Sequence, residues 1–138
     1  MAYGSGDASF LAAGGEAGIR QLVERFYALM DTRAVARDIR AMHPADLSVS
    51  RDKLATFLCG WLGGPRLYQD KYGSISIPGV HAHLAIDTAA RDAWLTIMAA
   101  AVAEQTWSED FKRYLLAQLA VPAERVRDVC AEHLRPKA

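Results

Sequence analysis

Apolar residues spaced by three and four positions are the feature of this sequence that most restricts its fold. The clearest set lies within residues 16–31 and consists of Ile19, Leu22, Val23, Phe26 and Met30. This spacing places the five side chains on one face of a helix. Alanine, the strongest helix former, occurs 25 times in 138 residues, and the alternation typical of strands is nearly absent outside the short run at 74–77. The sequence therefore predicts an all-α protein.

Glycine, proline and capping residues indicate where the expected helices begin and end. Pro44 disfavours helical geometry in the residue before it, so one helix ends near position 43. Ser48 and Ser108 are expected N-caps, and Pro122 is expected to kink or divide the last helix. The helices expected between these signals cover residues 8–13, 16–31, 34–42, 49–62, 66–71 and 88–105, followed by the last helix. The stretch at 73–79 is predicted to be a functional loop.

Composition and charge exclude several classes of protein. The chain has the length of a single domain, with 51% hydrophobic and 23% charged residues. Its 16 basic residues balance 16 acidic ones, whereas a nucleic-acid-binding protein normally has a basic face. The longest apolar stretch, residues 93–103, is too short to span a bilayer, and the N-terminus does not resemble a secretory signal. Cys59 and Cys130 form no disulfide or zinc motif, which favours a reduced, cytoplasmic compartment.

Two histidines follow the predicted loop. His81 and His83 have the spacing of half a zinc site, but the sequence does not supply two further ligands in a recognisable pattern. Taken alone, histidines in this position are more often packed or surface residues than ligands. Whether either histidine is a ligand therefore has to be judged from the surrounding motifs.

Three sequence blocks around these histidines resemble the group II truncated haemoglobins. The blocks are FYALMD at 26–31, FLCGWLGGPRLY at 57–68 and RDAWLTIM at 91–98, and the resemblance covers roughly residues 14–102. It implies an all-α truncated globin fold, a two-over-two helical sandwich that encloses one haem. On this interpretation residues 14–138 form the globin domain, and residues 1–13 are a short N-terminal segment.

The resemblance also implies the residues of the haem site. His81 matches the proximal histidine of the family and is the expected axial ligand of the iron. Because the sequence lacks a C-x-x-C-H motif, the expected cofactor is a non-covalent haem b. His83 stands where the family usually has proline, and we interpret it as a rim residue. The expected distal residues are Tyr27, His43, Ser50, Leu54 and Trp94. The expected haem contacts also include Phe57, Leu58, Leu84 and Met98.

Two of these assignments depend on the resemblance. Without it, the plainer interpretations are preferable: Tyr27 would be a core aromatic residue with a satisfied hydroxyl group, and Trp94 a packing ring in an alanine-rich helix. Ser50 occupies the place where many globins have a distal histidine, and its small side chain gives a bound gas only a weak, mobile hydrogen bond.

The expected propionate partners depart from the family pattern. Relatives commonly have arginines just before the proximal histidine, where this chain has none at residues 76–80. The candidates that remain are Lys53, Arg66, Tyr68 and Lys71. We favour Lys53, although solvation at the surface is the plain alternative for all three cations.

The function implied by the resemblance is reversible binding of O2, CO and NO at the haem iron. Redox removal of NO or peroxide is compatible with it, with a reductase as partner, but the sequence shows no dedicated acid–base pair, so an enzymatic role stays open. The alternative is a haem-based sensor or a ligand-delivery protein that works with a partner. A helical module without haem is a third interpretation. Both a monomer and a homodimer are compatible with the sequence.

Overall fold

The computed structural model describes residues 3–73 and 87–134, and every regular element within these ranges is helical. This confirms the all-α prediction for the described residues. In chain order the elements are α1 (Ala8–Ala12), α2 (Gly15–Thr32), the 3₁₀ turn η1 (Ala34–Ala36), α3 (Arg37–Ala41), α4 (Ser48–Trp61), α5 (Leu67–Tyr72), α7 (Thr88–Ala103) and α8 (Glu109–Leu134).

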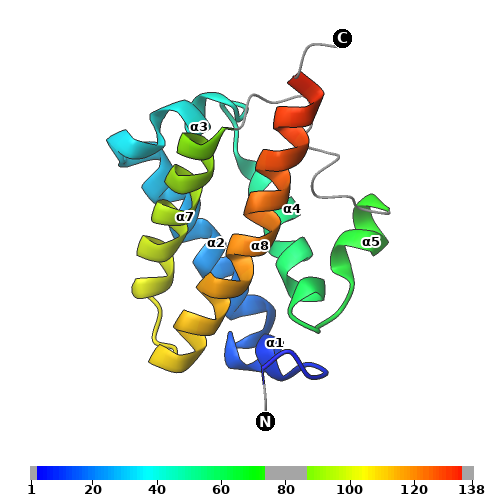
Figure 1. Ribbon diagram of the computed structural model, residues 1–138. Helices are drawn as coiled ribbons and strands as arrows, with labels where there is room; N and C mark the ends of the chain where they lie inside the picture. The colour runs from blue at the N-terminus through cyan, green and yellow to red at the C-terminus, as the bar shows by residue number, and fades with distance from the viewer. Residues whose placement is uncertain (1–2, 74–86, 135–138) are drawn as a thin grey trace.

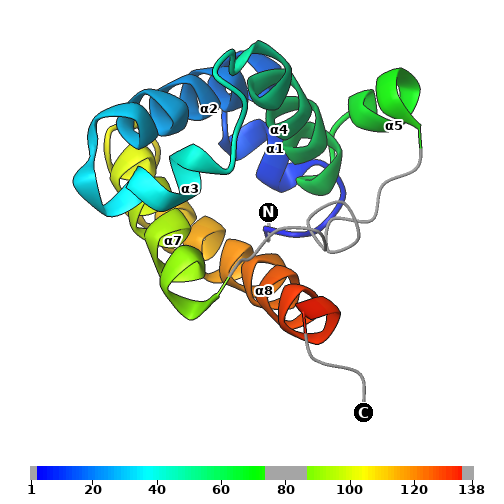
Figure 2. The ribbon, with the colours of Figure 1, turned by 90° about the horizontal axis from the view of Figure 1, so that it is seen from above.

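Four long helices form the body of the molecule. Helix α2 packs against both α4 and α7, and α7 packs against α8 (Figure 1). Seen from above, α2 and α4 form one pair and α7 and α8 the other, while α5 projects at the side of α4 (Figure 2). This arrangement confirms the expected two-over-two sandwich.

The core consists largely of the helix faces that the apolar spacing predicts. All five predicted residues of α2 are buried, with exposed fractions of 0–1%. In α8, Phe111, Leu115 and Leu119 are buried at intervals of four residues. Helix α7 contributes Ala90, Ala93 and Ala101 beside larger side chains, and these small residues allow neighbouring helices to approach closely.

The entrance to α4 differs from the prediction. Ser48 is not the N-cap but the first residue of the helix, and the N-cap position is held by Leu47 without a side-chain hydrogen bond. The carboxylate of Asp46 accepts hydrogen bonds from both the main-chain N–H and the hydroxyl of Ser48, at 2.9 and 2.6 Å. Because the hydroxyl donates to Asp46, an Asx turn starts this helix in place of the expected serine cap. The single helix expected at 34–42 is likewise divided into η1 and α3.

The prediction for the last helix is correct at its start, and of the two alternatives expected at Pro122, a division of the helix is excluded. The hydroxyl of Ser108 accepts a hydrogen bond from the main-chain N–H of Phe111 at 3.2 Å, as expected of an N-cap. Pro122 does not divide the helix, since α8 continues from Glu109 to Leu134. A proline removes one main-chain hydrogen bond, and the buried Leu119 and Val126 hold the helix on either side of it.

The N-terminal residues pack on the same helices as the rest of the chain. The N–H of Phe10 donates to the carbonyl of Leu62 at 3.0 Å, and the indole N–H of Trp107 donates to the carbonyl of Ala13 at 3.1 Å. The Tyr3 ring lies 5.3 Å from that of Phe111. Within the described residues, no helix is both long enough and apolar enough to cross a membrane.

The start of α7 provides a test of these helix assignments. The carboxylate of Asp87 accepts a hydrogen bond from the N–H of Ala90 at 2.8 Å. We expect Asp87→Ala to lower the free energy of unfolding by about 1 kcal/mol, measured by urea denaturation, because an N-terminal donor loses its partner. Asp87→Asn keeps an acceptor oxygen and is expected to retain most of the stability. Equal losses in both variants would mean that the cap oxygen is not responsible.

Candidate functional site

Four aromatic side chains from three parts of the chain meet between α2, α3 and α7. The ring centroid of Phe26 lies 5.0 Å from that of Tyr27 and 5.3 Å from that of Trp94. The Tyr27 ring lies 5.7 Å from the ring of His43, which follows α3. We call these four residues the aromatic cluster. It brings together three of the predicted distal residues, with Phe26 between two of them.

The hydroxyl of Tyr27 is enclosed by the protein but makes only a weak hydrogen bond. Tyr27 is 5% exposed, and its hydroxyl donates to the main-chain carbonyl of Ser50 at a long distance of 3.5 Å. Burial raises the pKa of Tyr27 to about 12, whereas the charge of Arg51 acts in the opposite direction. The hydroxyl is therefore protonated at neutral pH and can donate to a better acceptor.

A main-chain carbonyl orients the imidazole of His43. The Nδ1 atom lies 2.8 Å from the carbonyl oxygen of Ile39. Since a carbonyl only accepts, Nδ1 carries the hydrogen of this bond. The turn after the histidine is held by Arg40, whose guanidinium donates to the carbonyl oxygens of Pro44 and Ala45 at 2.9 and 3.0 Å. The end of α3 is thus built to keep this ring in one place.

Trp94 is the member of the aromatic cluster on α7. Its ring is partly buried against Phe26, and its indole N–H makes no hydrogen bond within the described residues. One turn earlier, the guanidinium of Arg91 forms an ion pair with the carboxylate of Glu124 on α8. This pair ties the start of α7 to α8. The sequence motif that contains Arg91 did not reveal its partner, because Glu124 lies far away in the chain.

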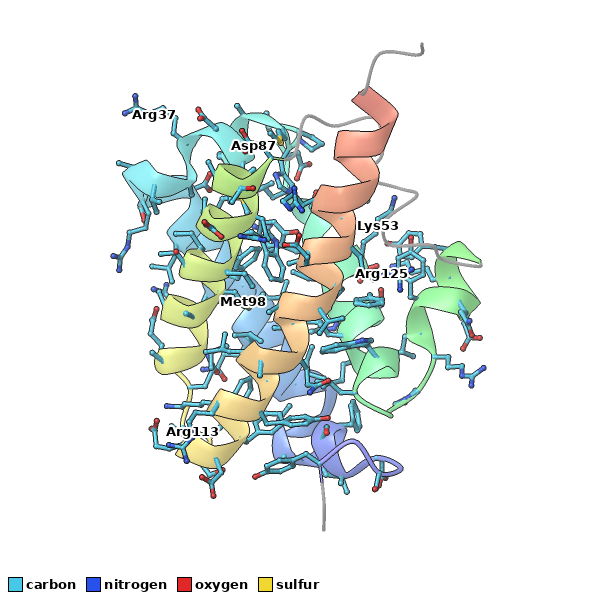
Figure 3. All side chains as sticks on the ribbon, viewed as in Figure 1. Arg37, Lys53, Asp87, Met98, Arg113 and Arg125 are labelled. Atoms are coloured by element: carbon cyan, nitrogen blue, oxygen red, sulfur yellow. The ribbon has the colours of Figure 1, made fainter. Side chains whose placement is uncertain are left out.

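The face of α4 beside the aromatic cluster carries the other predicted distal residues. Ser50 and Leu54 are both partly buried, and the atom of Ser50 that meets Tyr27 is its main-chain oxygen. Phe57 stacks on Trp61 with ring centroids 6.2 Å apart. Leu58 and Met98 are 1% and 0% exposed and belong to the core. Figure 3 shows Met98 on α7. The contacts with haem that the sequence predicts for these side chains stay predictions.

The predicted propionate partners lie at the junction of α4 and α5. Lys71 donates to the carboxylate of Asp52 at 2.8 Å, and the Nζ of Lys53 lies 5.3 Å from the centroid of the Tyr72 ring. The Tyr68 ring lies 5.0 Å from that of Tyr72. Arg66 is exposed and stands just before α5.

Asp52 and Tyr72 are two residues of this junction that the sequence did not identify. The Tyr72 hydroxyl lies 2.5 Å from the Asp52 carboxylate. Hydrogen bonds from Lys71 and Tyr72 lower the pKa of Asp52 to about 2, below its ordinary value of 3.8. The carboxylate is therefore charged at neutral pH. No sequence signal connects Asp52 with α5, since its partners are 19 and 20 positions away.

Three of the predicted site residues lie outside the described residues. They are the expected axial ligand His81, the rim residue His83 and the haem contact Leu84.

Comparison with known proteins identifies the family. The model of the bacterial-like globin family matches residues 8–127. A group II 2-on-2 hemoglobin from Agrobacterium tumefaciens is 37% identical, with a TM-score of 0.82 over 86% of this chain and 92% of that one. The chain belongs to the group II truncated globins. A cold-adapted truncated hemoglobin from Pseudoalteromonas haloplanktis is 30% identical, with a TM-score of 0.82 over 86% of this chain and 95% of that one.

A match to a characterised bacterial sequence agrees with this result. The group 2 truncated hemoglobin YjbI of Bacillus subtilis is 29% identical over 112 residues, which cover 81% of this chain and 83% of the relative. Membership of the globins implies haem and the binding of diatomic gases. The resemblance seen in the three sequence blocks is therefore confirmed over a longer part of the chain than those blocks cover.

The described residues of this truncated globin fit a haem. Leu54, Phe57 and Trp94 are apolar or aromatic side chains on α4 and α7 that the protein leaves only partly covered. A flat porphyrin requires such walls. Among the described residues, the Tyr27 hydroxyl has only its long hydrogen bond and the Trp94 N–H has no partner. The donor set therefore suits an apolar disc with a small polar ligand beside it.

Proposed function

We propose that this globin reversibly binds O2, and also CO and NO, at a non-covalent haem b whose iron is ligated by His81. The observation that carries the proposal is the aromatic cluster, in which three residues with polar atoms, Tyr27 on α2, His43 after α3 and Trp94 on α7, are joined by ring contacts. Packing of a helical core does not by itself require three aromatic residues with polar atoms in one cluster.

A haem held by His81 would supply the iron that binds the gas molecule. Tyr27 and Trp94 then act as hydrogen-bond donors to a gas that carries partial negative charge. Such bonds contribute about 1.5–3 kcal/mol each, and they favour O2 over the less polar CO. The burial that keeps Tyr27 protonated maintains its donor role across the neutral pH range.

The main-chain carbonyl of Ser50 positions the Tyr27 hydroxyl. It accepts a long hydrogen bond of 3.5 Å from the Tyr27 hydroxyl. A bond of this length is easily exchanged for a shorter one, so the donor is positioned without being strongly occupied. The small side chain of Ser50 leaves the donor role to Tyr27 and Trp94.

A relative supports O2 as the principal ligand. A structure from Bacillus subtilis described as a truncated oxygen-avid haemoglobin is 28% identical, with a TM-score of 0.77 over 86% of this chain. Strong retention of O2 suits chemistry on the bound gas better than transport. We therefore include redox removal of NO or peroxide in the proposal, with a reductase partner as the source of electrons. We also propose that the protein is cytoplasmic.

The absorption spectrum of the purified protein tests this function. We expect a haem spectrum in the oxidised protein, a shifted spectrum after reduction, and a further shift under CO. Reduced protein exposed to O2 should give a stable oxygenated spectrum that reverts when O2 is removed. A colourless protein that does not take up added hemin would refute the proposal.

A further inference from the structure

The short helix α5 depends on polar contacts for its position. None of its residues from Leu67 to Tyr72 is buried, and α4 is the element it packs against most extensively. A helix that buries so little apolar surface gains little from the hydrophobic effect. Apart from the partly buried Leu67, which packs against the core, its place beside α4 depends on the hydrogen bonds and ion pairs at their junction.

Asp52 is the centre of these contacts. One carboxylate oxygen accepts from the Lys71 ammonium at 2.8 Å and from the Tyr72 hydroxyl at 2.5 Å, so the last two residues of α5 meet the same atom. The other oxygen accepts from the Arg20 guanidinium on α2 at 3.2 Å. Arg20 is held in turn by Glu16 at 2.8 Å. One side chain thus connects α2, α4 and α5.

The same arrangement places two lysines. The ammonium groups of Lys53 and Lys71 lie 5.3 and 5.6 Å from the centroid of the Tyr72 ring, within the range of a cation–π contact. Figure 3 shows Lys53 on the side of α4 toward α5. Because Asp52 holds the hydroxyl of Tyr72, it also sets the position of the ring beside Lys53. Lys71 differs from Lys53, since its charge is paired with the carboxylate.

We infer that Asp52 is a positioning residue for haem retention, which holds Lys71 and Tyr72 so that Lys53 is the ammonium group presented to a haem propionate. This inference rests on the proposed haem function. It follows from the contacts at the junction together with the absence of arginine at residues 76–80, which leaves the cations of α4 and α5 as the candidates for this role. Asp52 acts through Tyr72 and Lys53 and does not itself touch the haem.

The rate at which hemin passes from the protein to an excess of apomyoglobin tests the inference. We expect Asp52→Asn and Lys53→Met each to accelerate hemin loss by about two- to five-fold, the range for a partly exposed ionic contact. The double variant should lose hemin no faster than the faster single variant, because both changes remove the same interaction. If Asp52 acted independently of Lys53, the acceleration of hemin loss in the double variant would equal the product of the two single accelerations.

Asp70→Asn is the matched control. It removes the same charge from α5 itself, at an exposed position, and is expected to leave hemin loss unchanged. Wild-type hemin loss in Asp52→Asn, or multiplied effects in the double variant, would overturn the inference.

Amide hydrogen exchange of the haem-free protein separates this inference from the proposed function. In Asp52→Asn, the amides of residues 67–72 should exchange faster than in wild type, whereas those of α2 and α7 should not change. If wild-type protein does not bind hemin, the proposed function fails. Unchanged exchange in α5 would overturn the positioning role of Asp52 independently of hemin binding.

Discussion

Replacing His81 by alanine is expected to leave the protein without stably bound haem. In the function proposed above, His81 is the proximal base that would hold the iron, and its loss would remove the bond between the protein and the iron. Purified His81→Ala should contain little haem, and hemin added to it should show no spectroscopic sign of nitrogen ligation. Imidazole supplied in solution should restore that ligation, because the rest of the pocket is intact.

His83→Ala is the matched control for this experiment. It removes the same side chain two positions later and is expected to keep both the haem and the axial nitrogen bond. If His83→Ala loses the ligand while His81→Ala keeps it, the two assignments must be exchanged. If neither variant loses it, the axial base lies elsewhere in the chain.

The periodic part of the fold could be predicted from sequence because one physical effect dominates it. The apolar face of α2 has a regular spacing, and all five of its predicted members are buried. Pro122 shows where this reasoning is insufficient. Its local cost is one lost hydrogen bond, and it is offset by burial of Leu119 and Val126, which depends on the neighbouring helices.

The candidate site divides in a similar way. Tyr27, His43 and Trp94 could be chosen from the sequence because they lie in or near motifs that match the family. The hydrogen bonds that hold Tyr27 and His43 in place could not be predicted, because they use main-chain atoms of other residues. The carbonyl of Ile39 orients His43, and Ser50 meets Tyr27 through its backbone oxygen rather than its side chain.

The junction of α4 and α5 is the clearest case of a site that sequence reasoning could identify only in part. Lys53 and Lys71 were recognised as cations, but nothing local distinguishes their surroundings. The structure shows that Lys71 is paired with Asp52 and that Lys53 lies beside Tyr72. Charge pairs between helices depend on how the helices pack, and packing is decided by the whole core.

Removing the hydroxyl of Tyr27 or the indole of Trp94 is expected to accelerate the release of O2 by roughly 5- to 150-fold, equivalent to about 1–3 kcal/mol for each lost donor. Tyr27→Phe keeps the ring and its contacts with Phe26 and His43, and it removes only the atom that now reaches Ser50. Trp94→Phe removes the indole N–H and also leaves space beside Phe26. Stopped-flow dissociation of O2 from the reduced protein measures both effects.

Carbon monoxide distinguishes hydrogen bonding from shape in the same variants. CO carries less negative charge than O2, so its release should change less in Tyr27→Phe, where the pocket volume hardly changes. The double variant should show less than the product of the two single effects on O2, since neighbouring donors to one ligand compensate for each other. Equal effects on both gases in Tyr27→Phe would mean that the ring acts by packing alone. The stabilisation of O2 by donors of the aromatic cluster would then have to be abandoned, while gas binding itself would stand.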